Sequence, residues 1–230
     1  DFDAIGSAFG VVCIAKKLGK NAFLVTDKEK TMAKPLVERA ETELPGVVVS
    51  TETAKLEFAK SKKNLLIIVD THIKSFVESP DLLSMSKMTI VIDHHRKMVN
   101  FIDNATIFHH EPYASSASEM VTELLQYFGD AGKIPSVHAE ALLAGITLDT
   151  KNFTLRTGVR TFEAAAFLRK LGADTVNVKS LFTNSIQCYK QKTELVSSAG
   201  IYKNCAIASA EKILDDMRIV APQAADELLG

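Results

Sequence analysis

The 230-residue sequence contains no continuous apolar run close to the roughly 18 residues that a membrane-spanning helix needs. It also lacks an excess of charge of either sign, because 27 Lys and Arg residues stand against 28 Asp and Glu residues. A protein that binds long nucleic acid usually has a broad positive surface, so this balance argues against such a partner. An anionic substrate is therefore expected to be small, or to be held through metal ions.

Cysteine is scarce as well. The three cysteines, Cys13, Cys188 and Cys205, are far apart and lack the spacing of a zinc site. We interpret them as reduced thiols, which are typical of a cytosolic compartment. No internal repeat, low-complexity segment or Gly/Ser-rich linker occurs. With 47% hydrophobic and 24% charged residues, the chain has the composition of a soluble globular protein and the length for one α/β domain and the beginning of another.

The most informative stretch that is present runs from Met88 to Lys97 and reads MTIVIDHHRK. Its apolar and β-branched residues lead directly into Asp93, His94 and His95. A buried parallel strand that delivers polar side chains at its carboxyl end has this pattern. Because two imidazoles and a carboxylate suit a divalent metal ion and a phosphate, the remaining ligands must be sought elsewhere in the chain.

Short apolar stretches alternate with segments of helical periodicity along the first half of the chain. This alternation predicts parallel βαβ units with right-handed crossovers. We therefore predict an α/β fold with a mostly parallel five-stranded sheet, helices on both of its faces and a first strand upstream of residue 1. Strands are expected within residues 21–26, 47–49, 65–69, 88–93 and 105–108, and helices within residues 3–19, 35–44, 51–60, 116–128 and 135–149.

The last part of the chain has a different pattern. Helices expected at residues 160–171, 175–182 and 185–198 follow one another with no strand between them. The segment CAIASA that begins at Cys205 then predicts a strand of a new sheet. We accordingly divide the chain into a first domain, residues 1–195, and residues 196–230, which form a connecting segment and the start of a truncated second α/β domain.

Acidic residues recur at the ends of the predicted elements. In an open parallel sheet, strand carboxyl ends and helix N-termini meet at one edge, so these side chains are expected to share one site. Oxygen ligands with one or two imidazoles suit Mn²⁺, Mg²⁺ or Fe²⁺ better than zinc. Their number fits two ions about 3.5 to 4 Å apart, which would generate a hydroxide for in-line attack on phosphorus. The acidic residues are Asp1, Asp3, Asp70, Asp93 and Asp149.

Each of these residues, taken alone, also has a purely structural explanation. An isolated Asp3 is more often a helix N-cap than a ligand, and Asp70 could begin a turn. Ser116 and Glu119 are fully explained as a capping box. The other histidines have simple explanations too: His72 at the surface, His109 and His110 at a strand end or in an exposed loop, and His138 on a helix surface. Only the combination of residues favours a metal site.

Four segments in order carry a resemblance to a known family. They are Asp1–Ala8 (DFDAIGSA), Asp70, Asp93–Arg96 (DHHR) and Gly145–Thr150 (GITLDT), and they resemble the four motifs of the DHH phosphoesterase superfamily. The stretches EPYASSASEMVTELL and LDTKNFTLRTGVRTFEAAAFLRKLGAD resemble one branch, the cyclic-di-AMP phosphodiesterases of Gram-positive bacteria. In that branch a DHH and a DHHA1 domain follow membrane, PAS and degenerate GGDEF segments. The resemblance therefore implies a DHH domain and the start of a DHHA1 domain.

The resemblance implies two Mn²⁺ ions, with Mg²⁺ or Fe²⁺ as alternatives. It also implies a histidine ligand upstream of residue 1 and a glycine-rich, histidine-containing DHHA1 motif beyond residue 230. For the metal ions, the resemblance implies Asp1 as a ligand of the first ion, Asp3, His94 and Asp149 as ligands of the second, and Asp70 as a bridge between both. It implies that Asp93 orients its neighbours. The implied substrate contacts are His95 and Arg96, which face the scissile phosphate, and Ser116.

By this resemblance, the leading hypothesis is a metal-dependent phosphodiesterase that hydrolyses cyclic di-AMP to 5′-pApA with metal-activated water. Alternatives within the superfamily are a short-oligonucleotide phosphatase, a RecJ-like exonuclease and a family II pyrophosphatase. The near-neutral charge argues against the exonuclease. An alternative of another class is a sensing module that binds a nucleotide without chemistry.

The expected partners are cyclic di-AMP and pApA, without long nucleic acid and without membrane contact by these residues. A homodimer is one further possibility. The resemblance places the chain in the cytoplasm, as part of a parent protein anchored in the cell membrane.

Overall fold

The computed structural model describes residues 1–128, 134–182, 186–210 and 217–229. The chain forms two compact units, residues 1–181 and residues 182–230. The division after residue 195, expected from the sequence, lies inside the second unit, near the end of α9 (Ile186–Ser197). All candidate ligands belong to the first unit.

The strands of the first unit pair in parallel, as expected. Strand β1 (Leu24–Val25) pairs with β2 (Val48–Val49), and β3 (Leu66–Val69), β4 (Thr89–Asp93) and β5 (Ile107–His110) form a sheet in that order. The α/β class is therefore confirmed, whereas a single five-stranded sheet is not. In the described part of the chain, the two short strands bond only to each other, and α1 (Phe2–Lys17) packs against both β1 and β3.

The register of the larger sheet brings polar residues to one edge. Asp93 lies opposite His110, and Ile92 lies opposite Val69. The amide of Asp70 continues the ladder by donating to the Ile92 carbonyl over 2.9 Å. The carboxyl ends of β3, β4 and β5 thus meet, as parallel strands must, and the buried side chains of Ile68, Val91 and Ile102 form the core beside them.

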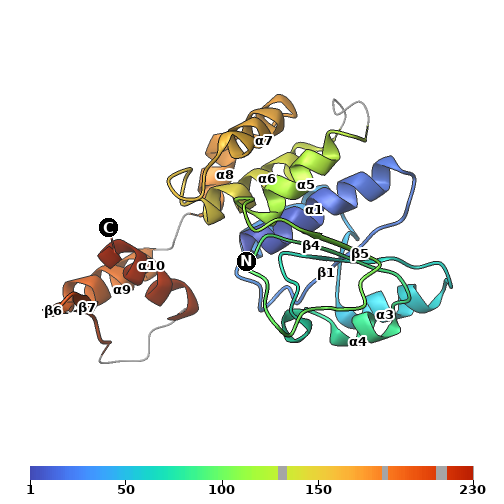
Figure 1. Ribbon diagram of the computed structural model, residues 1–230. Helices are drawn as coiled ribbons and strands as arrows, with labels where there is room; N and C mark the ends of the chain where they lie inside the picture. The colour runs from blue at the N-terminus through green and yellow to red at the C-terminus, as the bar shows by residue number, and fades with distance from the viewer. Residues whose placement is uncertain (129–133, 183–185, 211–216, 230) are drawn as a thin grey trace. The chain divides into compact units, whose positions relative to one another are not determined.

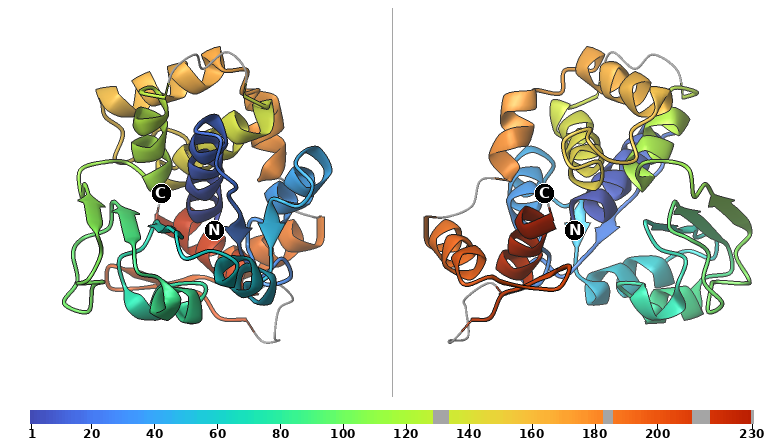
Figure 2. Two further views of the ribbon diagram at one scale, coloured as in Figure 1. Left: turned by 90° about the vertical axis from the view of Figure 1, so that its right-hand side faces the viewer. Right: turned by 60° about the vertical axis from the view of Figure 1, so that its left-hand side comes forward.

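Helices cover both sides of these strands, as Figure 1 shows for the first unit. In Figure 2, α1 lies in dark blue beside the green and yellow helices on one side, and the cyan to green α3 and α4 lie on the other. The close group on the first side contains α1, α5 (Ala117–Leu125), α6 (Ser136–Asp149), α7 (Val159–Lys170) and α8 (Thr175–Leu181). The remaining elements are α2 (Lys34–Glu43), which packs against α6, α3 (Thr51–Ala59), α4 (Pro80–Met85) and a 3₁₀ turn, Lys74–Phe76.

Local sequence explains where these helices begin. Asp1 caps α1, Ser50 caps α3 and Ser116 caps α5, each through a side-chain oxygen that accepts a backbone N–H. In α2 and α4 a proline stands in the first turn, where its missing N–H costs nothing. The cap of α1 is therefore Asp1, and the alternative explanation of Asp3 as an N-cap is wrong.

Two glycines let the helices around α1 approach closely. A Cβ at Gly6 would collide with the Ala141 carbonyl of α6, so α1 and α6 meet almost backbone to backbone. A Cβ at Gly145 would collide with Ser118 Oγ and lie 2.7 Å from Asp3 Oδ1. The glycine of the GITLDT segment thus makes room for a candidate ligand.

In the second unit, residues 186–210 and 217–229 form two helices and a hairpin. Strands β6 (Gly200–Tyr202) and β7 (Cys205–Ile207) are antiparallel, and Lys203 in their turn has a left-handed φ of 54°. The strand expected in CAIASA is therefore present. Helix α9 packs against α10 (Met217–Leu229), which buries Val220 and Ala224. In the described ranges, no helix combines the length and apolar character needed to cross a membrane.

Candidate metal centre

Asp3 is held in place by the N-terminus of another helix. It lies in the first turn of α1 and is completely buried. Its Oδ2 accepts the N–H of Ala117 over 2.8 Å, and its Oδ1 accepts the N–H of Ser118 over 2.9 Å. The first amides of a helix have no partner within the helix and favour an anion. Helix α5 therefore orients the Asp3 carboxylate.

The side chain of His94 lies close to three carboxylates, those of Asp3, Asp70 and Asp149. His94 follows β4, Asp70 follows β3 and Asp149 ends α6. The Nε2 atom of His94 lies 3.3 Å from Asp149 Oδ2, 3.4 Å from Asp70 Oδ1 and 3.7 Å from Asp3 Oδ2. Side chains from four separate segments thus converge.

The backbone at Asp70 is strained. Its φ of 60° lies in the left-handed region, which costs a non-glycine residue on the order of 1 kcal/mol. Aspartate tolerates this conformation better than most residues. The strain coincides with the point where the Asp70 carboxylate reaches His94, and such strain is typical of functional sites.

The centre contains buried polar atoms without partners. Among the described residues, neither Asp70 Oδ1 nor either ring nitrogen of His94 has a hydrogen bond of good geometry. Since nearly all buried polar atoms in proteins are paired, these atoms indicate a missing partner. Among the described residues, three sets of donors have ligand atoms within 4.8 Å of one another, and two of them contain His94: Asp70 with His94 and His95, and Asp3 with His94 and Asp149. The third set is His72 with Asp93 and His110. Carboxylates with imidazole fit Mn²⁺, Mg²⁺ or Fe²⁺.

The charges of the site support the same conclusion. Burial raises the pKa of Asp3 well above its usual value, and the nearby carboxylates of Asp70 and Asp149 raise it further. Burial by itself lowers the pKa of His94, but Asp149, Asp70 and Asp3 outweigh it and raise this pKa to about 10. The carboxylates thus create a strong demand for positive charge, which a divalent cation satisfies.

Asp93 faces away from this set and binds imidazoles instead. Its Oδ1 accepts the Nδ1–H of His95 over 2.8 Å and the backbone N–H of His95 over 3.3 Å, and its Oδ2 contacts His72 Nδ1. Although burial opposes it, bonding to His95 and His72 lowers the pKa of Asp93. The same bond to Asp93 raises the pKa of His95. The Asp93 carboxylate thus binds both imidazoles, and its orienting role stays a prediction.

The structure places the remaining predicted residues at different distances from the centre. Asp1 is exposed, and its Oδ1 accepts the N–H of Ala4 over 3.0 Å, which leaves it outside the donor sets found among the described residues. Arg96 is exposed and forms no ion pair within the described part of the chain. Ser116 is completely buried, where its Oγ accepts the Glu119 N–H over 3.0 Å.

The reciprocal half of the capping box is replaced. The Glu119 carboxylate accepts from the Ser115 hydroxyl over 2.6 Å. Ser116 therefore acts as the N-cap of α5, whose next two residues hold Asp3.

Two histidines expected at the surface are buried, so that interpretation was wrong. His72 and His138 are each 1% exposed. His72 contacts Asp93, and the Nδ1–H of His138 donates to the Phe9 carbonyl over 3.0 Å. His72 is the residue in contact with the candidate site that the sequence-based selection missed. Its position two residues after Asp70 placed it at the same sheet edge, and that was the available signal. His110 ends β5, in agreement with the strand-end explanation.

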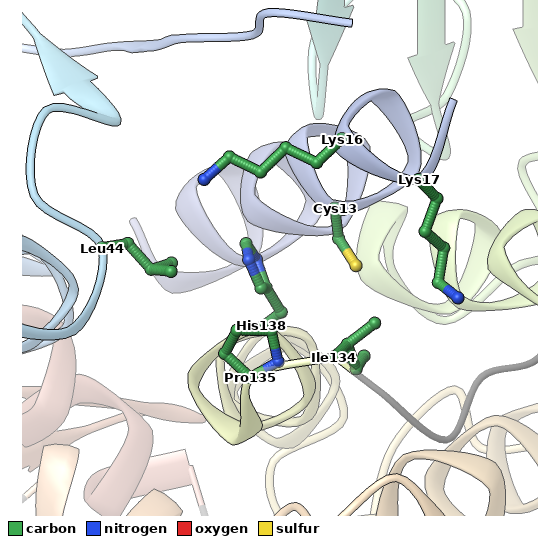
Figure 3. Close-up of a pocket in the computed structure, with 7 residues that line it drawn as sticks. All are labelled: Cys13, Lys16, Lys17, Leu44, Ile134, Pro135 and His138. Carbon is green, nitrogen blue, oxygen red and sulfur yellow. The ribbon is translucent and has the colours of Figure 1, made fainter. Parts of the chain in front are cut away.

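A hollow lies beside the C-terminal half of α1. This cavity of about 290 Å³ is lined by Cys13, Lys16, Lys17, Leu44, Ile134, Pro135 and His138. Figure 3 shows the two lysine side chains diverging from α1, with their amino groups on opposite sides. Since its cationic groups do not converge, the hollow lacks the arrangement of an anion site.

Comparison with known proteins shows a family and relatives to which the chain is similar. The family described as "DHH family, N-terminal domain" matches residues 1–146. The chain is 40% identical over 235 residues to the cyclic-di-AMP phosphodiesterase PdeA of Listeria monocytogenes serotype 1/2a (strain 10403S), with 100% of this chain and 36% of that protein covered. It is 42% identical over 234 residues to the cyclic-di-AMP phosphodiesterase GdpP of Geobacillus thermodenitrificans (strain NG80-2), with 100% of this chain and 35% of that protein covered. The chain thus spans about a third of the length of these relatives.

A solved structure shares the fold. It is the crystal structure of an exopolyphosphatase-related protein from Bacteroides fragilis, with a TM-score of 0.76 and 22% sequence identity. The match covers 97% of this chain and 68% of that one. At this identity the similarity concerns the fold alone.

Proposed function

The chain belongs to the DHH family, and from this premise we propose that it catalyses the metal-dependent hydrolysis of cyclic di-AMP to the linear dinucleotide 5′-pApA. The resemblance inferred from the motifs is confirmed by the family match and by the relatives named as cyclic-di-AMP phosphodiesterases. The observation that carries the proposal is the convergence of Asp3, Asp70 and Asp149 on His94, where Asp70 Oδ1 and the ring nitrogens of His94 are buried without a hydrogen bond of good geometry to any described residue.

The proposed ligands are the residues of this convergence. Asp3, His94 and Asp149 would hold one ion, and Asp70 would contact both. Asp1, two residues before Asp3, is the proposed ligand of the first ion from this chain. When bound, two Mn²⁺ ions, or Mg²⁺ or Fe²⁺, would supply a water of lowered pKa for attack on phosphorus and would offset the negative charge of the phosphate.

His95 and Arg96 are the proposed phosphate contacts. Because His95 Nδ1 is bonded to Asp93, its Nε2 points away from that carboxylate, and the side chain is 53% exposed. The raised pKa of His95 favours the protonated ring, which can donate to a phosphate oxygen. Arg96 adds a guanidinium that no described carboxylate neutralises, and guanidinium groups bind phosphate with two parallel hydrogen bonds.

The proposed product defines the bond that breaks. Water adds across one P–O3′ bond of the cyclic dinucleotide, so that phosphorus keeps its bond to O5′ and the departing O3′ takes a proton. One phosphodiester remains, and the molecule ends in a 5′-phosphate and a 3′-hydroxyl. His95 and Arg96 would stabilise the charge that develops on the phosphate oxygens during this step.

A substrate panel tests the proposal. The full-length protein is incubated with Mn²⁺ and, separately, cyclic di-AMP, pApA, a short oligoadenylate and pyrophosphate, with an Asp70→Asn variant as control. We expect conversion of cyclic di-AMP to pApA that stops on addition of EDTA and is lost in the variant. Preferred hydrolysis of the oligonucleotide or of pyrophosphate, hydrolysis without metal, or tight binding without turnover would each contradict the proposal and support one of the alternatives.

We also propose the setting implied by the resemblance, a cytoplasmic part of a membrane-anchored protein. The support is that the chain spans only 36% and 35% of the two relatives, which leaves room for further segments. Homodimer formation stays a prediction.

A further inference from the structure

His72 occupies the space between the ends of β3 and β4, and its hydrogen bonds assign its protonation. Its Nε2 accepts the backbone N–H of Met98 over 2.9 Å. A ring nitrogen that accepts a hydrogen bond carries no proton, so the proton of the neutral ring lies on Nδ1. Nδ1 faces Asp93 Oδ2. The network therefore assigns His72 as a neutral ring that donates from Nδ1 to Asp93.

Asp93 is consequently held between two imidazoles. His72 binds one of its oxygens, and His95 binds the other through Nδ1 over 2.8 Å. His95 is held from a further side, since His110 Nε2 lies 2.6 Å from its carbonyl oxygen. The orientation of the His95 ring thus depends on a carboxylate that His72 keeps in place.

The same residue fastens the segment that carries Arg96. The Met98 amide binds the His72 ring, and the Ile102 amide donates to the His72 carbonyl over 2.8 Å. Ile73 and Phe101 form an isolated antiparallel bridge beside these bonds. Residues 98 to 102 are therefore fastened to residues 72 and 73 at both ends.

We propose that His72 is a positioning residue, which fixes His95 through Asp93 and fixes the segment of Arg96 through Met98. Its catalytic consequence rests on the proposed function, whereas its hydrogen-bonding role does not. The competing explanation is that His72 fills space beside Phe108, whose ring centroid lies 6.4 Å from its own. A residue that only fills space would affect folding and would act independently of His95.

The chain offers a matched control in His138. It is buried to the same extent as His72, and it also donates from Nδ1, to the Phe9 carbonyl. It lines the hollow beside the C-terminal half of α1, away from the candidate metal centre. His72→Ala and His138→Ala therefore remove comparable buried rings. His72→Asn keeps an N–H donor near the position of Nδ1, because the asparagine amide overlaps that part of the ring.

The first experiment is a double-mutant cycle on the full-length protein with Mn²⁺ and cyclic di-AMP. We expect His72→Ala to lower kcat by about 100-fold, since misplacement of a reacting group by about 1 Å costs that much. His72→Asn should recover most of the loss, and His138→Ala should leave kcat within about twofold. In a His95→Ala background, His72→Ala should cost clearly less than about 100-fold, because the part of its effect that passes through His95 is already lost and only the part that passes through Met98 and the Arg96 segment remains.

The second experiment needs no catalysis. Hydrogen–deuterium exchange of the peptide that contains residues 97–102 should accelerate at least tenfold at Met98 in His72→Ala and remain unchanged in His138→Ala. Unchanged exchange, an equal loss of kcat in both alanine variants, or a full loss that persists in the His95→Ala background would overturn the proposal. If the wild-type protein does not hydrolyse cyclic di-AMP, the proposed function fails, and the exchange measurement alone decides the role of His72.

Discussion

The two ends of α1 bury titratable groups in opposite ways. At the N-terminal end, Asp3 lies beside Asp70, Asp149 and His94, and the carboxylates raise the pKa of His94 to about 10 although burial opposes them. Beside the C-terminal half of α1, the part of the chain that the structure describes gives the His138 ring one acceptor, the Phe9 carbonyl, and burial lowers the pKa of His138 to about 4. Burial alone favours a neutral ring, whereas burial among carboxylates favours a positive charge.

The difference between His94 and His138 distinguishes a site built for function from a buried residue that affects stability alone. Three carboxylates in one buried cluster repel one another, so the N-terminal end costs stability unless a cation is bound. At the other end the cavity is lined by His138, Cys13 and apolar groups, and its lysines diverge (Figure 3). A perturbed pKa with a cluster of like charges indicates a functional site, while a perturbed pKa from burial alone does not.

The sharpest way to test the comparison is to remove one histidine from each end. We expect His94→Ala to lower kcat/KM for cyclic di-AMP by about 1,000-fold or more, because the variant loses a ligand of the proposed centre and exposes its carboxylates to one another. His138→Ala and His109→Ala should change kcat/KM by less than about threefold. Steady-state kinetics at saturating Mn²⁺ measure all three variants, and similar losses would show that the ligand assignment is wrong.

Two glycines provide the next test. Gly145→Ala would push a Cβ against Ser118 Oγ and to 2.7 Å from Asp3 Oδ1, so Asp3 must shift. We expect a loss of kcat of about 100-fold, from misplacement of a ligand by about 1 Å. Gly10→Ala instead meets methyl groups of Val121 and Leu142 at 2.6 and 2.8 Å.

The Gly10→Ala variant is therefore the control for overpacking. Both variants should lose about 1 to 3 kcal/mol of unfolding free energy. Only Gly145→Ala should lose kcat when both are assayed well below their melting temperatures. Equal kcat values would mean that Asp3 does not need its observed position.

Divalent ions should stabilise the folded protein by binding at the N-terminal end of α1, where the candidate metal centre lies, and not at the hollow beside its C-terminal half. Mn²⁺ at a hundredfold excess over its Kd should raise the free energy of unfolding by about 2.7 kcal/mol, because it binds only the folded centre. Thermal unfolding with Mn²⁺ and with EDTA measures this shift. Asp70→Asn should abolish this shift, whereas Cys13→Ser, in the hollow beside the C-terminal half of α1, should retain it. A shift that survives in Asp70→Asn would place the ion elsewhere.

The smallest predicted effect concerns pH and His138. Its pKa of about 4 in the folded protein lies below the value of about 6.5 in the unfolded chain, so the unfolded state binds the proton more readily. The stability that depends on the neutral ring is complete above pH 6.5 and is lost as the pH falls toward 4. Between pH 7 and pH 5 this loss amounts to about 2 kcal/mol.

Urea denaturation of the wild type and of His138→Gln at both pH values isolates this contribution. The variant carries no titrating group at residue 138, so its pH dependence should be weaker by about 2 kcal/mol. Identical pH dependence in the two proteins would contradict the burial of a neutral His138.

Most of the candidate site was predictable because its residues stand at element ends. Asp70 and His94 directly follow apolar strands, and parallel strands share an edge by construction. The environment of His138 was not predictable in this way. Helix α6 is buried on nearly every side between Val137 and Ile146, so its sequence has no polar face from which the exposure of a histidine can be judged.

The sequence also did not reveal that Asp1 is the N-cap of α1 and that Asp3 is bound by the amides of α5. Both precede or begin the same helix, and an aspartate at either position can serve as an N-cap. The contact that distinguishes them is the bond from Ala117 to Asp3, which joins residues 114 positions apart. Local pattern carries no information about such a distant donor.

The sequence by itself determined the α/β class and the parallel strands, and it predicted the ligand set Asp1, Asp3, Asp70, His94 and Asp149, because apolar runs and the polar residues that end them are local features. Only the tertiary structure showed that the amides of α5 bind the Asp3 carboxylate and that the Asp93 carboxylate contacts the His72 and His95 rings. The physical reason is that these roles depend on how closely separate segments pack. The close packing of α1, α5 and α6 places the amides of α5 at the Asp3 carboxylate, and no local sequence pattern encodes that contact.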